Sequence, residues 1–561
     1  MRRGKTTIFL LTILFAAVAV LFGRNEIGAR NFPFSVTVTS DGVQEEIHCM
    51  KIVNDYYMFL PSYAQEETAR IRINPIYDVY IEGQQLTESQ PCTDFPENTK
   101  LELYFRSLEN EGYETITFVR SANVATMYID VPSGNMDYIH AEKGNSEPGW
   151  IRVYTEDGTL NHAGSLETIK GRGNLTWLDA KKPYSLELSQ EADILSLGKA
   201  SRWILLSNSH DHSHLRNKIA LDMAQDVNML YSPGCTWTDL YLNGEYAGLY
   251  LLSERNEVHS QRVDINADRS FLVAIEPDWR MDLQGYTYVQ TDDGTALRIH
   301  HSTIPQNTLL QIWQTAENAI FAEDGYDPAT GKRWDELIDI DSWARKYLIE
   351  EILANTDVGL ASEFFFYDES DGVIYAGPIW DMDVTLSDTS EPWLSHRAII
   401  AGRPRLTSPT DRHFFYELLQ KQAFRDRVEE LYRVEFRPIL NQLLNGGLEE
   451  YAQTTAQAAL SNQERWKTLD PEKMVAQIEV FLQKRMDFLD DYWIHGQQFF
   501  LVQVQQYNRV WAFAVCPGET LEDLPEFENG IWCRMDTDEI FDKTLPVNSD
   551  LELYFKENIQ S

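Results

Sequence analysis

Cysteine is scarce in this chain, with five residues among 561, and no two of them form a Cys-x-x-Cys arrangement. That absence excludes a zinc knuckle and a thioredoxin-type motif. If the chain is exported from the reducing cytoplasm, disulfide bonds Cys49–Cys92 and Cys516–Cys533 become possible, whereas Cys235 has no cysteine nearby in the sequence. The alternative is that all of them are small buried apolar residues.

Positive charge is also in short supply, because 48 Lys and Arg stand against 87 Asp and Glu, for a formal net charge of −39. Such a surface repels nucleic acid, so no nucleic-acid partner is expected. The apolar (43%) and aromatic (12%) contents are those of a folded protein rather than a disordered acidic tail. The length predicts about two to four domains.

The first 30 residues depart from this acidic pattern. Arg2, Arg3 and Lys5 precede an apolar run from Ile8 to Phe22, which is typical of an export signal. Residues 6–23 approach the ~20 residues needed to span a bilayer, and the basic residues favour a cytoplasmic N-terminus. We expect an uncleaved signal anchor in residues 1–30, with a cleaved signal peptide as the alternative. The rest of the chain is then extracytoplasmic, either anchored to the membrane or secreted.

The remaining sequence predicts an α+β protein with β-rich ends. Residues 31–124 carry alternating runs between turns and predict a β-sandwich-like accessory domain. Residues 125–494 mix strands with helices and are mostly helical over 303–356 and 408–494. Residues 495–561 predict a small β module, and 548–556 closely repeats 98–106. A β-rich half followed by a helical half predicts a two-lobed core with a cleft.

Three local patterns within the mixed region each predict one structural element. Apolar residues recur every four positions from Leu215 to Val227 and predict a helix there. Asn243-Gly244 between two alternating runs predicts a β-hairpin whose second strand ends at Glu254. Asp341 is the expected N-cap of a helix that runs through Asn355.

Two carboxylates follow the end of a predicted strand. The apolar run Val373–Ala376 stops at Gly377-Pro378, and Asp381 and Asp383 come next, with Asp357 upstream. Alternation puts Asp381 and Asp383 on one face of an extended segment, where like charges are costly unless a cation lies beside them. The pattern predicts a Mg²⁺ or Ca²⁺ site. The alternative is a turn in which these Asp side chains accept from backbone N–H groups.

A basic turn predicts an anion site. Gly171 and Gly173 flank Arg172, so exposed backbone N–H groups and a guanidinium lie together, and Asn174 follows. Lys181 and Lys182 open the next strand, and one of them can reach the same anion. The alternative is a hairpin with a solvated basic tip.

Further candidates lie at the ends of other predicted elements. Arg216 and Asn217 open the helix and can add to an anion site, and Glu254 can line a cleft at the end of the hairpin. Alternation of His210, His212 and His214 is compatible with a metal site, but the pattern lacks a clear fourth ligand.

Six motifs in one order resemble the CotH kinase family, whose namesake is a spore coat protein. They are Gly-Arg-Gly-Asn-x-Thr-Trp, Lys-Lys-Pro-Tyr, Leu-Arg-Asn-Lys, Tyr-Leu-Asn-Gly-Glu-Tyr-x-Gly-x-Tyr-Leu, Asn-x-Asp and Gly-Pro-x-Trp-Asp-x-Asp. The resemblance covers residues 125–490. It implies an atypical protein-kinase-like fold, with a β-rich N-lobe and a helical C-lobe, that transfers the γ-phosphoryl group of ATP to Ser or other hydroxyls with Mg²⁺ or Mn²⁺.

The resemblance also implies roles for individual residues. Lys182 or Lys181 corresponds to the lysine that holds the ATP phosphates, and the turn around Arg172 corresponds to the phosphate-facing turn. Asp357 corresponds to the aspartate that orients the acceptor hydroxyl or binds metal. Asp381 corresponds to the metal-binding aspartate, which Asp383 assists.

The chain departs from the family pattern where some relatives carry an Asn metal ligand a few residues after the first aspartate. Ser362 or Glu363 would have to serve here. At the other end of the chain, Val510–Phe555 resembles the β-grasp-like repeats of Gram-positive surface proteins, which are accessory modules, so it is assigned no chemistry.

These patterns together predict an extracytoplasmic kinase that acts on a protein at the cell or spore surface. A non-catalytic adhesin or scaffold with the same fold, a pseudokinase, is the alternative. A third hypothesis is another transferase with a nucleotide-like donor. The placement of Lys and Arg in one half and carboxylates in the other favours the kinase, since phosphoryl transfer depends on positioning and charge neutralisation.

Overall fold

The computed structural model describes residues 32–387, 391–407, 412–506, 508–526 and 530–557. It is a mixed α+β structure, with 27% helix and 34% strand in several sheets, as the sequence predicts. The predicted signal anchor in residues 1–30 lies outside the described residues. Within the described ranges, none of the helices combines the length and the apolar character that crossing a membrane requires.

The chain divides into two compact units, which are described separately below. The first, here called the barrel unit, contains the residues up to His214 together with Cys235–Arg255 and Glu450–Met474. The second, here called the helical unit, contains Leu215–Gly234, Asn256–Glu449 and the residues from Val475 onward.

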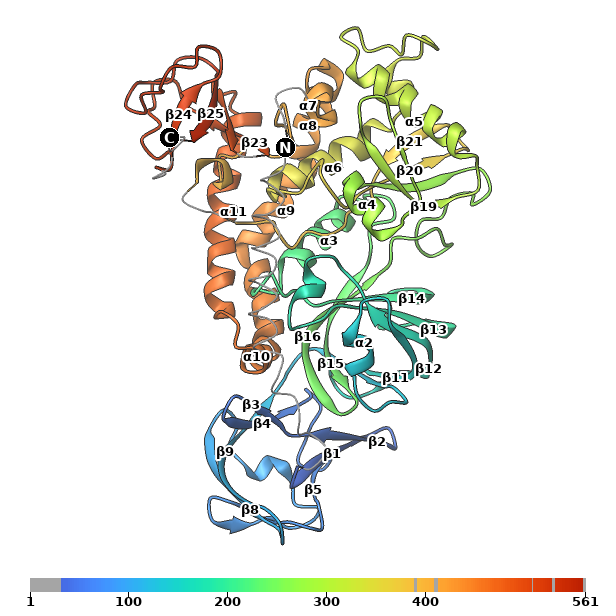
Figure 1. The fold of residues 1–561 in the computed structure, drawn as a ribbon, viewed down its shortest axis with the longest axis vertical. Helices are drawn as coiled ribbons and strands as arrows, with labels where there is room; N and C mark the ends of the chain where they lie inside the picture. Colours follow the sequence, from blue (N-terminus) through green and yellow to red (C-terminus); the bar gives the residue numbers. More distant parts are fainter. Residues whose placement is uncertain (1–31, 388–390, 408–411, 507, 527–529, 558–561) are drawn as a thin grey trace. The chain divides into compact units, whose positions relative to one another are not determined.

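Two sheets form the N-terminal part of the barrel unit (Figure 1). The three-stranded sheet has the order β2-β1-β5 and the six-stranded sheet has the order β3-β4-β9-β8-β6-β7. The strands are β1 (Phe34–Ser40), β2 (Val43–His48), β3 (Met50–Ile52), β4 (Asp55–Leu60), β5 (Ala69–Ile73), β6 (Asp78–Ile81), β7 (Gln84–Gln85), β8 (Lys100–Arg106) and β9 (Glu111–Arg120). Val36 on β1 and Met58 and Phe118 on the larger sheet belong to one buried core. The two sheets therefore bury their apolar faces against each other.

A closed seven-stranded barrel follows, in the order β10-β11-β12-β13-β14-β16-β15. Its strands are β10 (Ala125–Asp130), β11 (Ser146–Tyr154), β12 (Leu160–Gly171), β13 (Tyr184–Asp193), β14 (Lys199–Leu206), β15 (Cys235–Leu242) and β16 (Glu245–Glu254), and α2 (Asp137–Ala141) precedes β11. Parallel pairing of β10 with β15 closes the barrel. The hairpin at Asn243-Gly244 and its end at Glu254 are confirmed.

The helical unit contains a five-stranded sheet in the order β18-β19-β17-β20-β21. Its strands are β17 (Phe271–Ile275), β18 (Tyr288–Gln290), β19 (Ala296–Ser302), β20 (Glu363–Asp368) and β21 (Val373–Ala376). The helices of this unit are α3 (Arg216–Asp226), α4 (Asp278–Gln284), α5 (Gln306–Phe321), α6 (Ile340–Ile352), α7 (Phe414–Leu419), α8 (Gln422–Leu431), α9 (Arg437–Gln442) and most of α11 (Pro471–Trp493). Helix α10 (Leu448–Trp466) belongs almost entirely to the barrel unit. The predicted helix from Leu215 and the predicted strand Val373–Ala376 are confirmed.

One local prediction is wrong, and one open alternative is decided. The N-cap of α6 is Asp339, whose side chain accepts from the Ser342 backbone N–H, and Asp341 instead pairs with Arg427 at 2.7 Å. The helix begins two residues earlier than an N-cap at Asp341 would require, so the cap moves with it. The five cysteines all lie within the described ranges, and no two of them form a disulfide there. Four are buried, and Cys49 and Cys92 serve as small core residues, which was the alternative interpretation.

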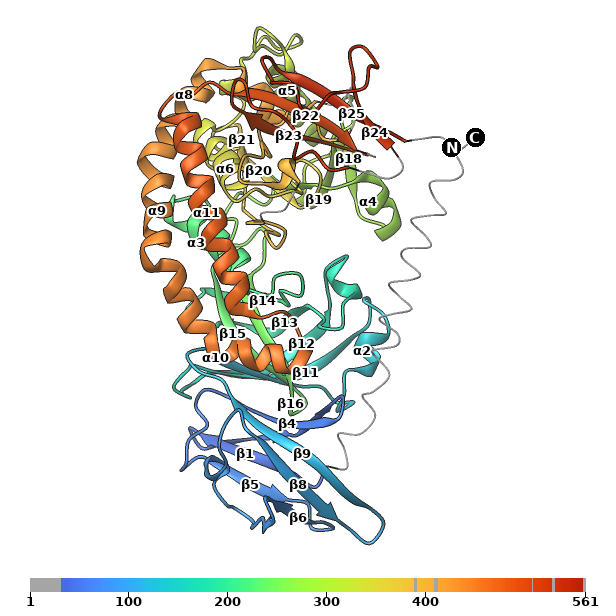
Figure 2. The ribbon, with the colours of Figure 1, turned by 90° about the vertical axis from the view of Figure 1, so that its left-hand side faces the viewer.

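The C-terminal residues form a four-stranded sheet in the order β23-β22-β25-β24, seen in Figure 2. Its strands are β22 (Phe500–Gln506), β23 (Arg509–Val515), β24 (Gly530–Arg534) and β25 (Leu551–Glu557). The repeated stretch forms β8 and β25, but β25 has a parallel neighbour and β8 has none. The repeat therefore specifies a single strand and not a shared module.

Segment 395–406 of the helical unit binds along the edge of this sheet. Ile399 N donates to Ala512 O (2.8 Å), Ala514 N donates to Arg397 O (3.0 Å), and Val510 N donates to Leu406 O (2.9 Å). Trp393, just before the segment, is buried in the core of the C-terminal sheet. The sheet is thus built into the helical unit by both backbone pairing and a shared core.

A buried ion pair anchors the same segment on its other side. Arg485 on α11 lies 2.8 Å from Glu351 on α6, and their side chains are 0% and 1% exposed. The guanidinium also donates to the carbonyl oxygens of His396 and Ala398, both at 2.7 Å. The carboxylate accepts from the backbone N–H groups of Ile400 and Gly402. Because both charges are hydrogen-bonded, their burial is tolerated.

Substituting Arg485→Met is expected to destabilise the helical unit by about 3–5 kcal/mol, because Glu351 would remain buried without its cation. The measurement is the thermal unfolding midpoint of the full-length chain. The matched control is Arg534→Met, which breaks an exposed pair with Asp536 at 3.1 Å and should cost less than about 1 kcal/mol. Equal effects of the two substitutions would contradict the assignment.

A carboxylate is buried within the barrel unit as well. Asp239 on β15 is 0% exposed and accepts a hydrogen bond from Tyr246 Oη at 2.8 Å. Burial raises the pKa of Asp239 to about 6, although the hydroxyl and the nearby Lys181 ammonium oppose the shift. The folded state therefore holds this proton at pH values where the unfolded chain has lost it.

Barrel stability should consequently fall as pH rises from about 4 to about 6, by about 3 kcal/mol, and should not fall further through this group at higher pH. Asp239→Asn should remove that slope, since the amide oxygen can still accept from Tyr246 but cannot titrate. The check is the unfolding midpoint from pH 4 to 8, with the exposed Asp137→Asn as the control. A slope unchanged by Asp239→Asn would refute the explanation.

Candidate functional site

The turn after β21 presents Asp381 in a fixed geometry. A side chain at Gly377 (φ +126°) would meet Met229 Cε at 2.7 Å, so glycine is required there. Ile379 and Met382 are fully buried, whereas Asp381 between them is exposed and Asp383 is half-buried. Asp381 adopts a left-handed backbone conformation (φ +64°), which Asp tolerates better than most residues. Its Oδ2 accepts a hydrogen bond from Ser362 Oγ at 2.8 Å.

Two residues at the start of α3 hold the backbone of this turn. Asn217, which is buried, accepts at Oδ1 from the Met382 N–H at 2.9 Å. Arg216 Nη1 donates to the Asp383 carbonyl oxygen at 3.1 Å. The structure thus brings two predicted anion-site residues together with the predicted metal-binding turn, where they position its backbone.

Asp357 lies in the loop after α6, and Asn355 fixes that loop. Asn355 Oδ1 accepts from the Asp357 N–H at 3.1 Å, and its Nδ2 donates to Glu350 Oε2 at 2.7 Å. The same amide nitrogen lies 3.4 Å from Met382 Sδ in the Asp381 turn. Asn355 therefore links the loop that carries Asp357 to the turn that carries Asp381.

Two arginines also bind the Asp357 loop, and nothing in their sequence context predicts it. Arg509 Nη2 lies 3.5 Å from Asp357 Oδ1, and Arg509 Nη1 donates to the Thr356 carbonyl oxygen at 3.5 Å. Arg403, which is 1% exposed, donates to the carbonyl oxygens of Val358 and Ile400, both at 3.2 Å.

A second group of charges lies behind Ser362. Lys346 pairs with Glu350 at 3.3 Å and with Glu363 at 3.9 Å, and all three side chains are buried. Burial raises the pKa of Glu363 to about 7, against the opposing effect of Lys346. Glu363 is therefore a structural carboxylate inside the unit, and Ser362 is the residue that contacts Asp381.

Glu276 is a carboxylate that sequence reasoning missed. Ile275 on β17 pairs with Glu363 on β20, so Glu276 and Ser362 lie just past the ends of two adjacent strands. Glu276 pairs with Arg280 at 2.7 Å. Burial raises its pKa, and the Asp381 charge adds to the shift. The detectable signal was a lone Glu directly after the apolar strand Phe271–Ile275.

The basic turn lies in the barrel unit, between β12 and β13. A side chain at Gly171 would collide with the Trp177 ring, and one at Gly173 (φ +79°) would collide with the Thr176 hydroxyl. Steric fit within the turn therefore accounts for both glycines, independently of any ligand. Arg172 is half-buried, Asn174 is exposed, and Lys143 Nζ donates to the Gly173 carbonyl oxygen at 3.0 Å. The turn therefore carries more basic side chains than the sequence motif alone contains.

The two candidate lysines differ in environment. Lys181 is 5% exposed, and its ammonium donates to the Leu249 carbonyl oxygen and lies 4.7 Å from the centre of the Tyr250 ring. Lys182 is half-buried, donates to the Trp177 carbonyl oxygen at 2.7 Å and lies over the Trp177 ring. Burial lowers the pKa of both lysines, strongly for Lys181.

The remaining candidates of the barrel unit are spread over different elements. Glu254 ends β16, where it pairs with Trp203 of β14. The three alternating histidines have different partners: His210 contacts Asp179 at 3.0 Å, His212 accepts from the Leu469 N–H, and His214 contacts Asn462. They do not converge on one point.

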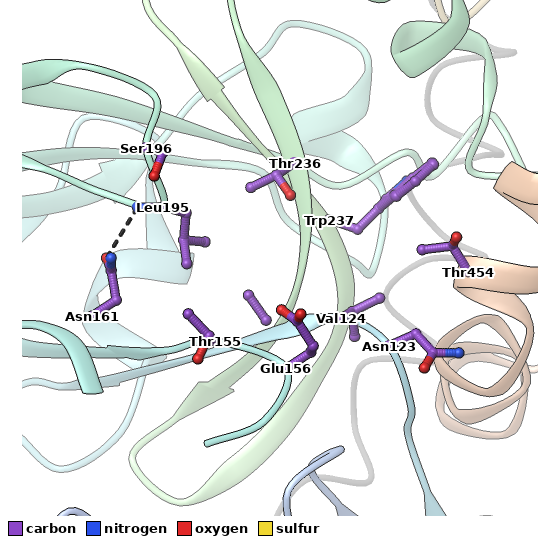
Figure 3. Close-up of a pocket in the computed structure, with 11 residues that line it drawn as sticks. Asn123, Val124, Thr155, Glu156, Asn161, Leu195, Ser196, Thr236, Trp237 and Thr454 are labelled. Atoms are coloured by element: carbon purple, nitrogen blue, oxygen red, sulfur yellow. Dashed lines mark hydrogen bonds between the residues drawn. The ribbon is translucent and has the colours of Figure 1, made fainter. Parts of the chain in front are cut away.

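The barrel unit contains a pocket, shown in Figure 3, that none of the predicted site residues lines. It has a volume of about 240 Å³, and Glu156, Thr236 and Trp237 are among its lining residues. Asn161 in its wall accepts a hydrogen bond from the Leu195 backbone N–H at 3.0 Å. The pocket therefore does not belong to the predicted nucleotide site.

The oxygen donors of the Asp381 turn fit a hard cation. Among the described residues, no group of three or more His, Cys, Asp and Glu side chains is placed to hold a metal alone. Mg²⁺ in phosphoryl-transfer enzymes is often held by one or two carboxylates together with substrate phosphates. The exposed Asp381 carboxylate suits this partial coordination, with Asp383 two residues further along the chain. The prediction of an extended segment for these two residues is wrong, because Asp381 adopts a left-handed backbone conformation in a turn.

Comparisons with known proteins assign the chain to a family. No curated protein matches it. The family model described as CotH kinase protein matches residues 169–489, more than half of the 561 residues, and this range contains the basic turn, Asp357 and Asp381. The chain therefore belongs to the CotH kinase family.

Proposed function

We propose that this protein is an extracytoplasmic kinase of the CotH type, which transfers the γ-phosphoryl group of ATP to a hydroxyl of a surface or spore-coat protein. Family membership supports a kinase-like function. The N-terminal basic and apolar pattern supports the extracytoplasmic location, with the membrane contact through residues 6–23. A two-lobed kinase-like core is part of this proposal.

The observation that carries the proposal is the Asp381 turn. Its carboxylate is exposed, while Asn217, Arg216 and Ser362 fix the backbone and the side chain around it. A carboxylate that is fixed in position but accessible to solvent suits a divalent cation that binds together with ATP. Mg²⁺ or Mn²⁺ held by Asp381 and Asp383 would supply charge neutralisation at the ATP phosphates.

Asp357 is proposed to orient the acceptor hydroxyl. Asn355 holds its backbone N–H and Arg509 pairs with its carboxylate, so the side chain is held in place at 42% exposure. A carboxylate oxygen in such a position can accept a hydrogen bond from a Ser hydroxyl. Positioning of this kind is a large part of what phosphoryl transfer needs.

The phosphate-binding role is proposed for the basic turn, with Arg172 and either Lys181 or Lys182. Backbone N–H groups of a glycine-containing turn and several cations suit a phosphate chain. Lys143 adds a further basic side chain there through its contact with Gly173.

A non-catalytic scaffold is the second candidate, and two observations favour it. The Lys181 ammonium is buried against Leu249 O and the Tyr250 ring, so its donors already have a partner inside the protein. The amide ligand of some relatives is also replaced by Ser362 and Glu363, and Glu363 is buried with Lys346. A chain of this kind would use its fold to bind a partner without transferring phosphate.

Asp381→Asn is expected to lower phosphate transfer at least about 100-fold, because the amide removes the negative charge that a cation needs. The assay uses the full-length chain with γ-labelled ATP, Mg²⁺ or Mn²⁺, and a Ser-rich protein acceptor. The matched control is Asp371→Asn, an exposed Asp that accepts from Tyr375 Oη in the β20–β21 hairpin and should retain wild-type transfer.

Transfer by Asp381→Asn at the wild-type rate would refute the kinase assignment. ATP binding without transfer by the wild-type chain, measured by calorimetry with Mg²⁺ present, would establish the scaffold alternative instead.

A further inference from the structure

Arg509 of the C-terminal sheet bridges two groups of the Asp357 loop. Its two terminal nitrogens contact the Asp357 carboxylate and the Thr356 carbonyl oxygen, each at 3.5 Å. A guanidinium is planar and can hold two acceptors in a fixed relation, which an ammonium cannot. The contact therefore restrains both the backbone and the side chain of this segment.

Trp511, two residues after Arg509 on β23, supports that restraint. The Trp511 ring lies 5.4 Å from the Arg509 guanidinium and 5.6 Å from the buried Arg403 guanidinium. Arg403 in turn donates to the Val358 carbonyl oxygen, on the other side of Asp357. The carbonyl groups of both neighbours of Asp357 are thus held by arginines that share one aromatic ring.

Backbone pairing sets the register of Arg509. The Val510 N–H donates to the Leu406 carbonyl oxygen at 2.9 Å, and Ile399 and Ala514 continue the pairing along β23. A shift of this strand by one residue would move Arg509 to the opposite face. The edge contact with segment 395–406 therefore determines which side chain reaches Asp357.

We propose that Arg509 is a positioning residue for Asp357, and that the C-terminal sheet is a working part of the kinase rather than an accessory module. Arg509 lies outside the family-matched range of residues 169–489. The inference deepens the proposed function and depends on it for the role of Asp357 in catalysis. The positioning of the Asp357 loop itself can be tested without catalysis.

The first test is structural and uses the full-length chain with Arg509→Met or Arg509→Lys. The N–H groups of Leu360 and Ala361 donate to the Asp357 carbonyl oxygen at 2.9 and 3.2 Å, so their hydrogen exchange reports on this loop. Exchange should become about two- to fivefold faster in Arg509→Met, which corresponds to the loss of a partly exposed ion pair. Arg534→Met, in the exposed Asp536 pair of the same sheet, should leave it unchanged.

The second test is kinetic. Arg509→Met should lower kcat about 10- to 100-fold with little change in the KM for ATP, because the acceptor hydroxyl and not the nucleotide loses its orientation. Arg509→Lys should recover only part of the loss. Adding Arg509→Met to Asp357→Asn should cause no further decrease, since both act through one carboxylate.

The outcomes separate this inference from the proposed function. Unchanged exchange at Leu360 and Ala361 in Arg509→Met would overturn the positioning role, whether or not the wild-type chain transfers phosphate. A rise in kcat would overturn it as well, because Arg509 would then restrain Asp357 against catalysis. Faster exchange in a chain that transfers no phosphate would uphold the positioning role while refuting the kinase proposal.

Discussion

The buried ion pair between Glu351 and Arg485 is the contact on which the helical unit depends. It joins α6 to α11, and the backbone of residues 396–402 supplies further hydrogen bonds to both charges. Such a pair is stable only when each charge has several partners, and here the segment supplies them. The segment's other edge is then free to pair with β23.

From this pair, a continuous set of contacts leads to the candidate site. Segment 395–406 pairs with β23, β23 carries Arg509, and Arg509 contacts Asp357. Arg403 in the same segment holds the neighbouring carbonyl group of Val358. The residues that support the site are buried or half-buried charges, whereas Asp357 and Asp381 are left accessible. This arrangement suits carboxylates that must remain in place until a charged ligand arrives.

Acidic side chains serve two purposes in the helical unit. Asp381 is exposed and Asp357 half-buried, both in loops, whereas Glu351 and Glu363 are acidic groups inside the unit. The buried carboxylates neutralise Arg485 and Lys346 and so shape the scaffold. A strongly acidic chain thus uses part of its negative charge for internal pairing and part for the candidate site.

Local sequence patterns determined the elements and motifs that depend on near neighbours. The period of four residues predicted α3, Asn243-Gly244 predicted the β15–β16 hairpin, and Val373–Ala376 predicted β21. The six-motif order predicted the family that the family model then showed. The predictions of the helix, the hairpin and the strand are confirmed because the hydrogen bonds and side-chain periods that specify them involve residues a few positions apart.

Only the tertiary structure decided the partners that are distant in the chain. Closure of the barrel through β10 and β15, the Glu351–Arg485 pair, and the contact of Arg509 with Asp357 each join segments separated by a hundred residues or more. No periodicity marks such pairs, because an arginine that neutralises a carboxylate looks like a solvated arginine in the sequence. Packing and the satisfaction of buried charges select these partners, and those forces act only once the chain has folded.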